Sequence, residues 1–125
     1  MELNDISGAV IGAAIEVHRV LGPGLLESAY ELALERELEL RGLPVRRQLA
    51  VPLEYKGRAL GDDFRLDLVV CDMVLVEIKA VERLLPIHEA QLLTYLRLCN
   101  KRLGLLINFN EKVLKEGVKR IANAM

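Results

Sequence analysis

Hydrophobic positions near the N-terminus recur at intervals of three and four residues, which is the spacing of one face of an α-helix. They predict a first helix that begins at Asn4 or Asp5 and runs to about residue 21. The glycines and proline of residues 22–24 (GPG) end it, because these residue types break helices. The same spacing predicts a second helix over residues 26–41, which Gly42 stops.

Four later segments have the apolar, β-branched composition of strands, and they are residues 45–55, 64–70, 73–79 and 103–108. Pro52 has no amide proton, so the first segment is expected to be an edge strand or to be broken there. A turn is predicted at Lys56-Gly57. Pro86 opens a third helix that runs to about Cys99, before the last apolar segment.

The predicted order is therefore helix, helix, three strands, helix, strand and tail. Consecutive strands can pair antiparallel, whereas the strand–helix–strand step over residues 73–108 should bring in a parallel neighbour through a right-handed crossover. This order predicts an α/β fold with a mixed β-sheet and helices packed on it. The tail over residues 111–125 fits either a helix or a short strand.

The composition fits one folded domain over residues 1–125. Hydrophobic residues make up 52% of the chain and aromatic residues only 4%, so a sizeable aliphatic core is expected. The net charge of −1 argues against a protein that coats duplex nucleic acid by bulk charge, but it allows a local basic groove.

Several features of the sequence bear on its compartment. No apolar run approaches the ~20 residues of a membrane span, and the acidic start MELND lacks the basic residues of a signal peptide. Cys71 and Cys99 lie far apart and form no zinc-binding spacing, so they are expected to be reduced thiols. These features predict a cytoplasmic protein that does not contact a membrane.

The stretch FRLDLVVCDMVLVEIKA, residues 64–80, carries charges inside a predicted hairpin. Alternate residues of a strand share a face, so Glu77 and Lys79 point the same way, and Leu66 and Leu68 share a face of their own strand. A two-residue loop would put Asp67 on the opposite face from Glu77. A three-residue loop over residues 71–73 instead places Asp67 opposite Glu77 and gathers the charges on one side, and we favour it.

Two facing carboxylates repel each other unless a cation lies between them. Lys79 supplies one positive charge, and Mg²⁺ or Mn²⁺ would supply more, because both ions prefer oxygen ligands. The carbonyl of Ile78 is a further candidate ligand. With a lysine beside the metal, such a site is suited to phosphodiester hydrolysis. An exposed sheet face with ordinary salt bridges explains the hairpin equally well.

A set of motifs in a fixed order favours the first explanation. Gly24, Glu27 and Tyr30 spell GxxExxY within GPGLLESAY, and GDDFRLDLVV, VEIKAVE, HEAQLLTYL and LLINF follow. Over residues 6–123 the chain resembles the GxxExxY family, whose members are assigned to the PD-(D/E)XK nuclease superfamily. The resemblance implies a restriction-endonuclease-like α/β core, in which a helix precedes a β-meander and a crossover helix leads to another strand.

The resemblance also implies a site. Matched by motif, it consists of a helix glutamate, a strand aspartate, the ExK pair and a polar residue of the next helix, which are Glu27, Asp67, Glu77, Lys79 and Gln91. The implied activity is that of a Mg²⁺- or Mn²⁺-dependent nuclease acting on DNA or RNA. The alternatives are a non-catalytic module that binds nucleic acid or protein, and a subunit of a homo-oligomer or of a larger assembly.

Several of these residues also have a purely structural explanation. Glu27 is a favourable charge in the first turn of a helix, and Gln91 fits a polar residue on a mostly apolar helix. His18 and His88 lie near helix ends, where caps or surface positions are the expected roles, and packing is expected for Tyr30. A small basic cluster on the first strands could follow phosphates or protect a sheet edge, and it consists of Arg46, Arg47, Lys56 and Arg58.

Overall fold

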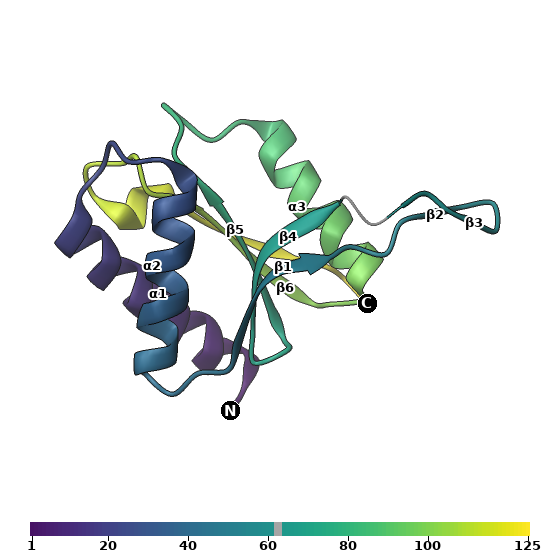
Figure 1. The fold of residues 1–125 in the computed structure, drawn as a ribbon, viewed down its shortest axis with the longest axis horizontal. Helices are drawn as coiled ribbons and strands as arrows, with labels where there is room; N and C mark the ends of the chain where they lie inside the picture. The colour runs from purple at the N-terminus through teal and green to yellow at the C-terminus, as the bar shows by residue number, and fades with distance from the viewer. Residues whose placement is uncertain (62–63) are drawn as a thin grey trace.

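A five-stranded mixed β-sheet forms the centre of the protein, with helices on both faces (Figure 1). The computed structural model describes residues 1–61 and 64–125. The strands lie in the order β1–β4–β5–β6–β7. In that order their bounds are Val45–Ala50, Arg65–Val70, Val74–Lys79, Leu103–Asn108 and Val118–Ala122. Only β5 and β6 pair parallel within this sheet, which confirms the predicted α/β class and the crossover.

Helices α1 (Leu3–Leu21) and α2 (Glu27–Leu40) pack on one face of the sheet, and α3 (Pro86–Cys99) packs on the other. Within β5, Val76 and Ile78 belong to the apolar core under α1 and α2, whereas Leu75 belongs to the core under α3. Both faces of β5 are therefore buried, which explains its nearly continuous apolar sequence. No helix in the described ranges is both long and apolar enough to cross a membrane.

The hairpin of β4 and β5 has the register that the sequence favours. Leu68 pairs with Val76 and Val70 with Val74, so the loop comprises the three residues 71–73. Cys71 has a φ of 53° and the next residue one of 55°, a left-handed conformation that closes the short loop. In this register Asp67 lies opposite Glu77, and the prediction of a three-residue loop is confirmed.

Both ends of the chain differ from a simple reading of the pattern. The first helix begins at Leu3 rather than at an Asn4 or Asp5 cap, because Glu2 occupies the cap position and its N–H donates to the Asp5 carboxylate at 3.1 Å. At the other end, a 3₁₀ helix η1 (Leu114–Gly117) leads into strand β7 at the sheet edge. The choice between helix and strand for the tail is thus decided mainly in favour of a strand.

A second, small sheet lies outside the main one. The predicted first strand ends at Ala50, and after the break at Pro52 strand β2 (Glu54–Tyr55) pairs with β3 (Arg58–Ala59) across the turn at Lys56. We call residues 53–60 the arm. It projects away from the body of the protein as a thin ribbon (Figure 1).

Candidate active site

Strands β4 and β5 are paired over only part of their length. Three residue pairs join them, from Leu68–Val76 to Val70–Val74. Beyond these pairs β5 stays with β6 up to Lys79, while β4 stays with β1 up to Arg65. The sheet therefore opens between β4 and β5, and we call this opening the fork; β4 and β1 lean from it toward the arm (Figure 1).

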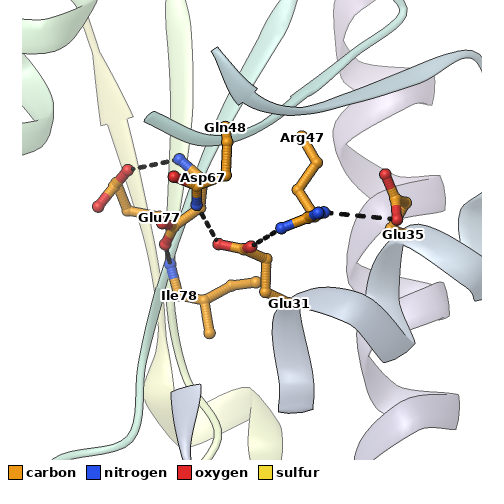
Figure 2. Close-up of polar contacts among 7 residues, drawn as sticks. All are labelled: Glu31, Glu35, Arg47, Gln48, Asp67, Glu77 and Ile78. Atoms are coloured by element: carbon orange, nitrogen blue, oxygen red, sulfur yellow. Dashed lines mark hydrogen bonds and ion pairs between the residues drawn. The ribbon is translucent and has the colours of Figure 1, made fainter. Parts of the chain in front are cut away.

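The carboxylates of Asp67 and Glu77 lie where the fork begins. The backbone N–H of Asp67 donates to Oε1 of Glu77 at 3.1 Å, and the backbone N–H of Ile78 donates to Oδ2 of Asp67 at 2.8 Å (Figure 2). Each carboxylate thus accepts a hydrogen bond from the strand opposite its own. These side chains replace the backbone partners that a continuing ladder would use, so the same residues carry the charge and open the strands.

The alternation of side chains is also interrupted at Asp67. Leu68 belongs to the core under α1 and α2, whereas Leu66 belongs to the core under α3. The expectation that Leu66 and Leu68 share a face is therefore wrong. The neighbouring strand β1 is irregular at the same place, since Gln48 has a φ of 57° and no pairing links it to Asp67. The backbone is irregular on both sides of this aspartate.

The two carboxyl groups have strongly perturbed acidities. Burial, and after it the charge of Asp67, raises the pKa of Glu77 to about 8. Burial likewise raises the pKa of Asp67 to about 7, against a hydrogen bond from Ile78 that lowers it, and Glu31 adds to the increase. Lys79 lowers the pKa of both carboxyls. The charge of Lys79 therefore does not offset the cost of burying the two carboxyl groups.

Lys79 is the last residue of β5, and its backbone is firmly held. Its carbonyl accepts the N–H of Phe109 at 2.9 Å. The buried side chain of Asn108 then binds Val81 twice, accepting its N–H at 3.0 Å and donating to its carbonyl at 2.9 Å. The Asn108 amide thereby acts as a strand partner beyond the end of the sheet and fixes the chain that carries the Lys79 side chain.

The GxxExxY residues bring Glu27 to the same end of β5. The Glu27 carboxylate accepts the N–H of Ala80, the residue after Lys79, at 3.3 Å. Tyr30 is fully buried, and its hydroxyl donates to the carbonyl of Gly22 and accepts the N–H of Leu25, which ties down the loop before α2. Packing was the expected role of Tyr30, and its ring indeed stacks on Phe109 with centroids 4.6 Å apart.

Glu31 is a further carboxylate at the site, and sequence reasoning missed it. It is 7% exposed, and it accepts hydrogen bonds from Gln48 at 2.8 Å and from Arg47 at 3.1 Å (Figure 2). Arg47 also lies 3.7 Å from Glu35. One signal was present in the sequence: Glu31 follows Glu27 by four residues, so two like charges share one stripe of α2, an arrangement that is unfavourable without a reason.

Other predicted residues lie elsewhere. The Gln91 amide donates to the hydroxyl of Tyr95 at 3.1 Å on α3, and no described contact joins it to the carboxylates. His88 caps α3 by accepting the N–H of Leu85 at 3.0 Å, and His18 contacts the carbonyl of Glu111 at 2.7 Å. His88 therefore has the capping role expected near a helix end, whereas the half-buried His18 joins α1 to the segment before η1 instead of capping its helix.

The oxygen-only donors at the fork suit Mg²⁺ or Mn²⁺ in kind. Asp67 and Glu77 fit such an ion, since a bound cation would offset the cost of burying their charges, which is the largest cause of their raised pKa values. The fit is incomplete, because the carboxylates of Glu27, Asp67 and Glu77 each already accept a backbone N–H. Across residues 1–61 and 64–125, no three Asp, Glu, His or Cys side chains converge as a ready-made metal site.

A mixed sheet flanked by helices, with a β-hairpin and a parallel strand after a crossover helix, is the restriction-endonuclease-like α/β fold. Residues 4–121 match the family model of the PD-(D/E)XK nuclease superfamily, and the chain belongs to this superfamily. The superfamily match confirms the wider assignment and does not separate GxxExxY proteins from other members. Comparisons with curated proteins and with solved structures gave no match.

Proposed function

We propose that this protein is a metal-dependent nuclease that hydrolyses phosphodiester bonds of DNA or RNA with Mg²⁺ or Mn²⁺. The observation that carries the proposal is the pair of carboxylates at the fork, Asp67 and Glu77, with Lys79 at the end of the same strand. Buried carboxyl groups with raised pKa values are typical of functional sites, because burying a charge costs free energy that apolar packing at the same position would not.

The proposed roles follow from chemistry and position. Asp67 and Glu77 would hold the cation, with the carbonyl of Ile78 and the carboxylate of Glu27 as further ligands. The ion would polarise a phosphoryl oxygen and help to activate water. Lys79 would stabilise negative charge that develops on the phosphate or orient the attacking water. Gln91 remains a proposed site residue on α3, with a contact to substrate as its expected role.

Glu31 has a proposed role that does not require contact with the ion. Its bonds to Arg47 and Gln48 connect α2 to β1, the strand that pairs with β4. Because its charge also raises the pKa of Asp67, it acts on the ionisation of that ligand. We therefore treat Glu31 as a positioning residue, which sets the geometry and charge of the fork.

One observation favours a second candidate function. Three carboxylates do not converge within the described part of the chain, and those of Glu27, Asp67 and Glu77 each accept a backbone N–H. A module that binds nucleic acid or protein without cleaving it, or a subunit that a partner chain completes, would have such a site. The expected cytoplasmic location and the oligomeric state stay predictions under either candidate.

Two measurements on the same proteins test the nuclease proposal. Calorimetric titration of Mn²⁺ should show binding by wild type and much weaker binding by Glu77→Gln. A control, Glu39→Gln, removes an exposed carboxylate of α2 and should bind as wild type does. Cleavage of single-stranded, double-stranded and branched DNA and of RNA should then require the metal and fail in Glu77→Gln.

Each outcome decides between the candidates. Metal-dependent cleavage that Glu77→Gln abolishes supports the nuclease. Nucleic-acid binding without cleavage of any substrate, in Mg²⁺ or Mn²⁺, supports the binding module. Equal Mn²⁺ binding by wild type, Glu77→Gln and Glu39→Gln contradicts a metal site at the fork.

A further inference from the structure

The arm is a two-stranded ribbon that is separate from the main sheet. Glu54 pairs with Ala59 and Tyr55 with Arg58, and the N–H of Leu60 donates to the carbonyl of Leu53 at 2.9 Å. Residues 56 and 57 form the turn with φ values of 48° and 85°, the two-residue turn that matches the twist of a hairpin. Residues 54–60 are all exposed.

The two faces of the arm differ in chemistry. Alternation places Tyr55 and Leu53 on one face, together with their cross-strand partners Arg58 and Leu60. On this face Tyr55 is 61% exposed, and the ammonium of Lys56 lies 5.3 Å from the centre of its ring. Glu54, the only carboxylate of residues 53–60, lies on the reverse face.

The other two members of the predicted basic cluster, Arg46 and Arg47, lie outside the arm and are already paired with carboxylates. Arg46 pairs with Asp72 at 3.3 Å, and Arg47 pairs with Glu31 at 3.1 Å. Lys56 and Arg58 have no such ion pair among the described residues. Within this cluster, the two cations without an ion pair to a described residue are therefore those that flank the exposed tyrosine.

An isolated two-stranded hairpin is marginally stable in water. One that also exposes a tyrosine and aliphatic side chains gains from a partner that covers this face. The arm leaves β1 after Ala50 and the chain returns to β4, whose third residue is Asp67. The arm is thus attached to β1 and β4, the two strands that separate from β5 at the fork.

We propose that the arm binds a single-stranded segment of the nucleic acid that the site acts on. This proposal rests on the proposed function. Tyr55 stacks on an unpaired base, and Lys56 and Arg58 contact the flanking phosphates. Stacking on an aromatic side chain next to cations is how single strands are held without reading their sequence. Two cations are too few to hold a duplex through its backbone alone, so the unpaired strand is the better fit.

The test measures binding separately from chemistry. A fluorescently labelled 20-nucleotide single-stranded DNA, its RNA equivalent and the DNA duplex are titrated by anisotropy with the full chain in EDTA. Tyr55→Ala should weaken single-strand binding by roughly 5- to 150-fold, since stacking is worth about 1–3 kcal/mol per base. Arg58→Ala should also weaken it and reduce the slope of log K against log salt by about 0.7.

The reverse face supplies the matched control. Glu54→Ala should bind single strands as wild type does or slightly more tightly, because it removes the arm's negative charge. Melting curves of the three variants should agree with wild type, since the arm adds little to the core. Binding that Tyr55→Ala and Glu54→Ala weaken equally, or a wild type that binds none of the three probes, overturns the proposal.

The failures of the two proposals are distinguishable. If Tyr55→Ala cleaves nucleic acid and its affinity for single strands is unchanged, the nuclease proposal is supported and the proposal for the arm is refuted. Loss of single-strand affinity in Tyr55→Ala, without cleavage by wild type, would support the arm and refute the nuclease. A wild-type dimer that Tyr55→Ala converts to a monomer in sedimentation, with unchanged affinity for the probes, would assign the arm to a second copy of the chain and also refute the proposal.

Discussion

The hairpin of β4 and β5 and the hairpin of the arm lie in very different surroundings. The hairpin of β4 and β5 lies within the sheet, and Leu68 and Leu75 are both fully buried, on opposite faces. The arm has two residue pairs, all of them exposed. Both hairpins turn through residues with positive φ, so local turn chemistry does not account for the difference.

The comparison separates the part of the chain that provides stability from the part that is free to bind. Packing on both faces of β5 supplies enough stability to keep two carboxylates at the fork in an unfavourable place. The arm contributes little to the core, so its sequence can be devoted to a partner. Mutations in the two hairpins should therefore affect different measurements.

The largest effect is expected from matched leucine truncations. Leu75→Ala should lower the free energy of unfolding by about 2–5 kcal/mol, because Leu75 is fully buried under α3 and its loss leaves a cavity. Leu60→Ala on the arm, where the side chain is 48% exposed, should change it by less than about 0.5 kcal/mol. Urea denaturation of both variants measures the difference, and equal losses would show that the arm packs on the body.

The pH dependence of stability should give the next largest effect. Because the pKa values of Asp67 and Glu77 are raised on folding, the folded state binds more protons than the unfolded state between about pH 4 and 8. Their contribution to stability is thus present at low pH and is lost as pH rises through 7 and 8.

Melting temperatures from pH 5 to 9 measure this loss. Glu77→Gln should flatten the profile and be more stable than wild type at pH 8.5. The control Glu54→Gln on the arm should follow wild type throughout, because its carboxylate is exposed. Parallel profiles for wild type and Glu77→Gln would contradict a raised pKa at the fork.

Much of this architecture could be predicted because it depends on local pattern. The break at Pro52, the turn at Lys56 and the three-residue loop after β4 follow from residue type and loop length. The opposition of Asp67 and Glu77 followed from the same register. The parallel step into β6 followed from the strand–helix–strand order.

The remainder depended on tertiary contacts that periodicity does not encode. Glu31 looked like a solvated helix residue, and only its contacts with Arg47 and Gln48 identify it. The change of face between Leu66 and Leu68 accompanies the irregular backbone at Asp67 and Gln48, which no local pattern announces. The separate pairing of the arm depended on where β1 stops, which a continuous β-like sequence does not reveal.

The smallest effect concerns the connection between α2 and β1. Arg47→Met and Glu31→Gln, singly and together, should give a coupling energy of about 1 kcal/mol, since the arginine side chain is 40% exposed and the glutamate 9%. Urea denaturation of the four proteins completes this double-mutant cycle. Additive effects would mean that the ion pair does not contribute to holding β1 on the helix.

The most direct test of the account is Lys79→Ala, assayed for both Mn²⁺ binding and cleavage. Lys119→Ala, which removes an exposed lysine of β7, is the control. The account predicts that Lys79→Ala still binds Mn²⁺ and nucleic acid, while its cleavage rate falls by ~10²-fold or more, as when one charge-stabilising group is removed. Equal cleavage by Lys79→Ala and Lys119→Ala, or no cleavage by wild type on any DNA or RNA substrate, would contradict it.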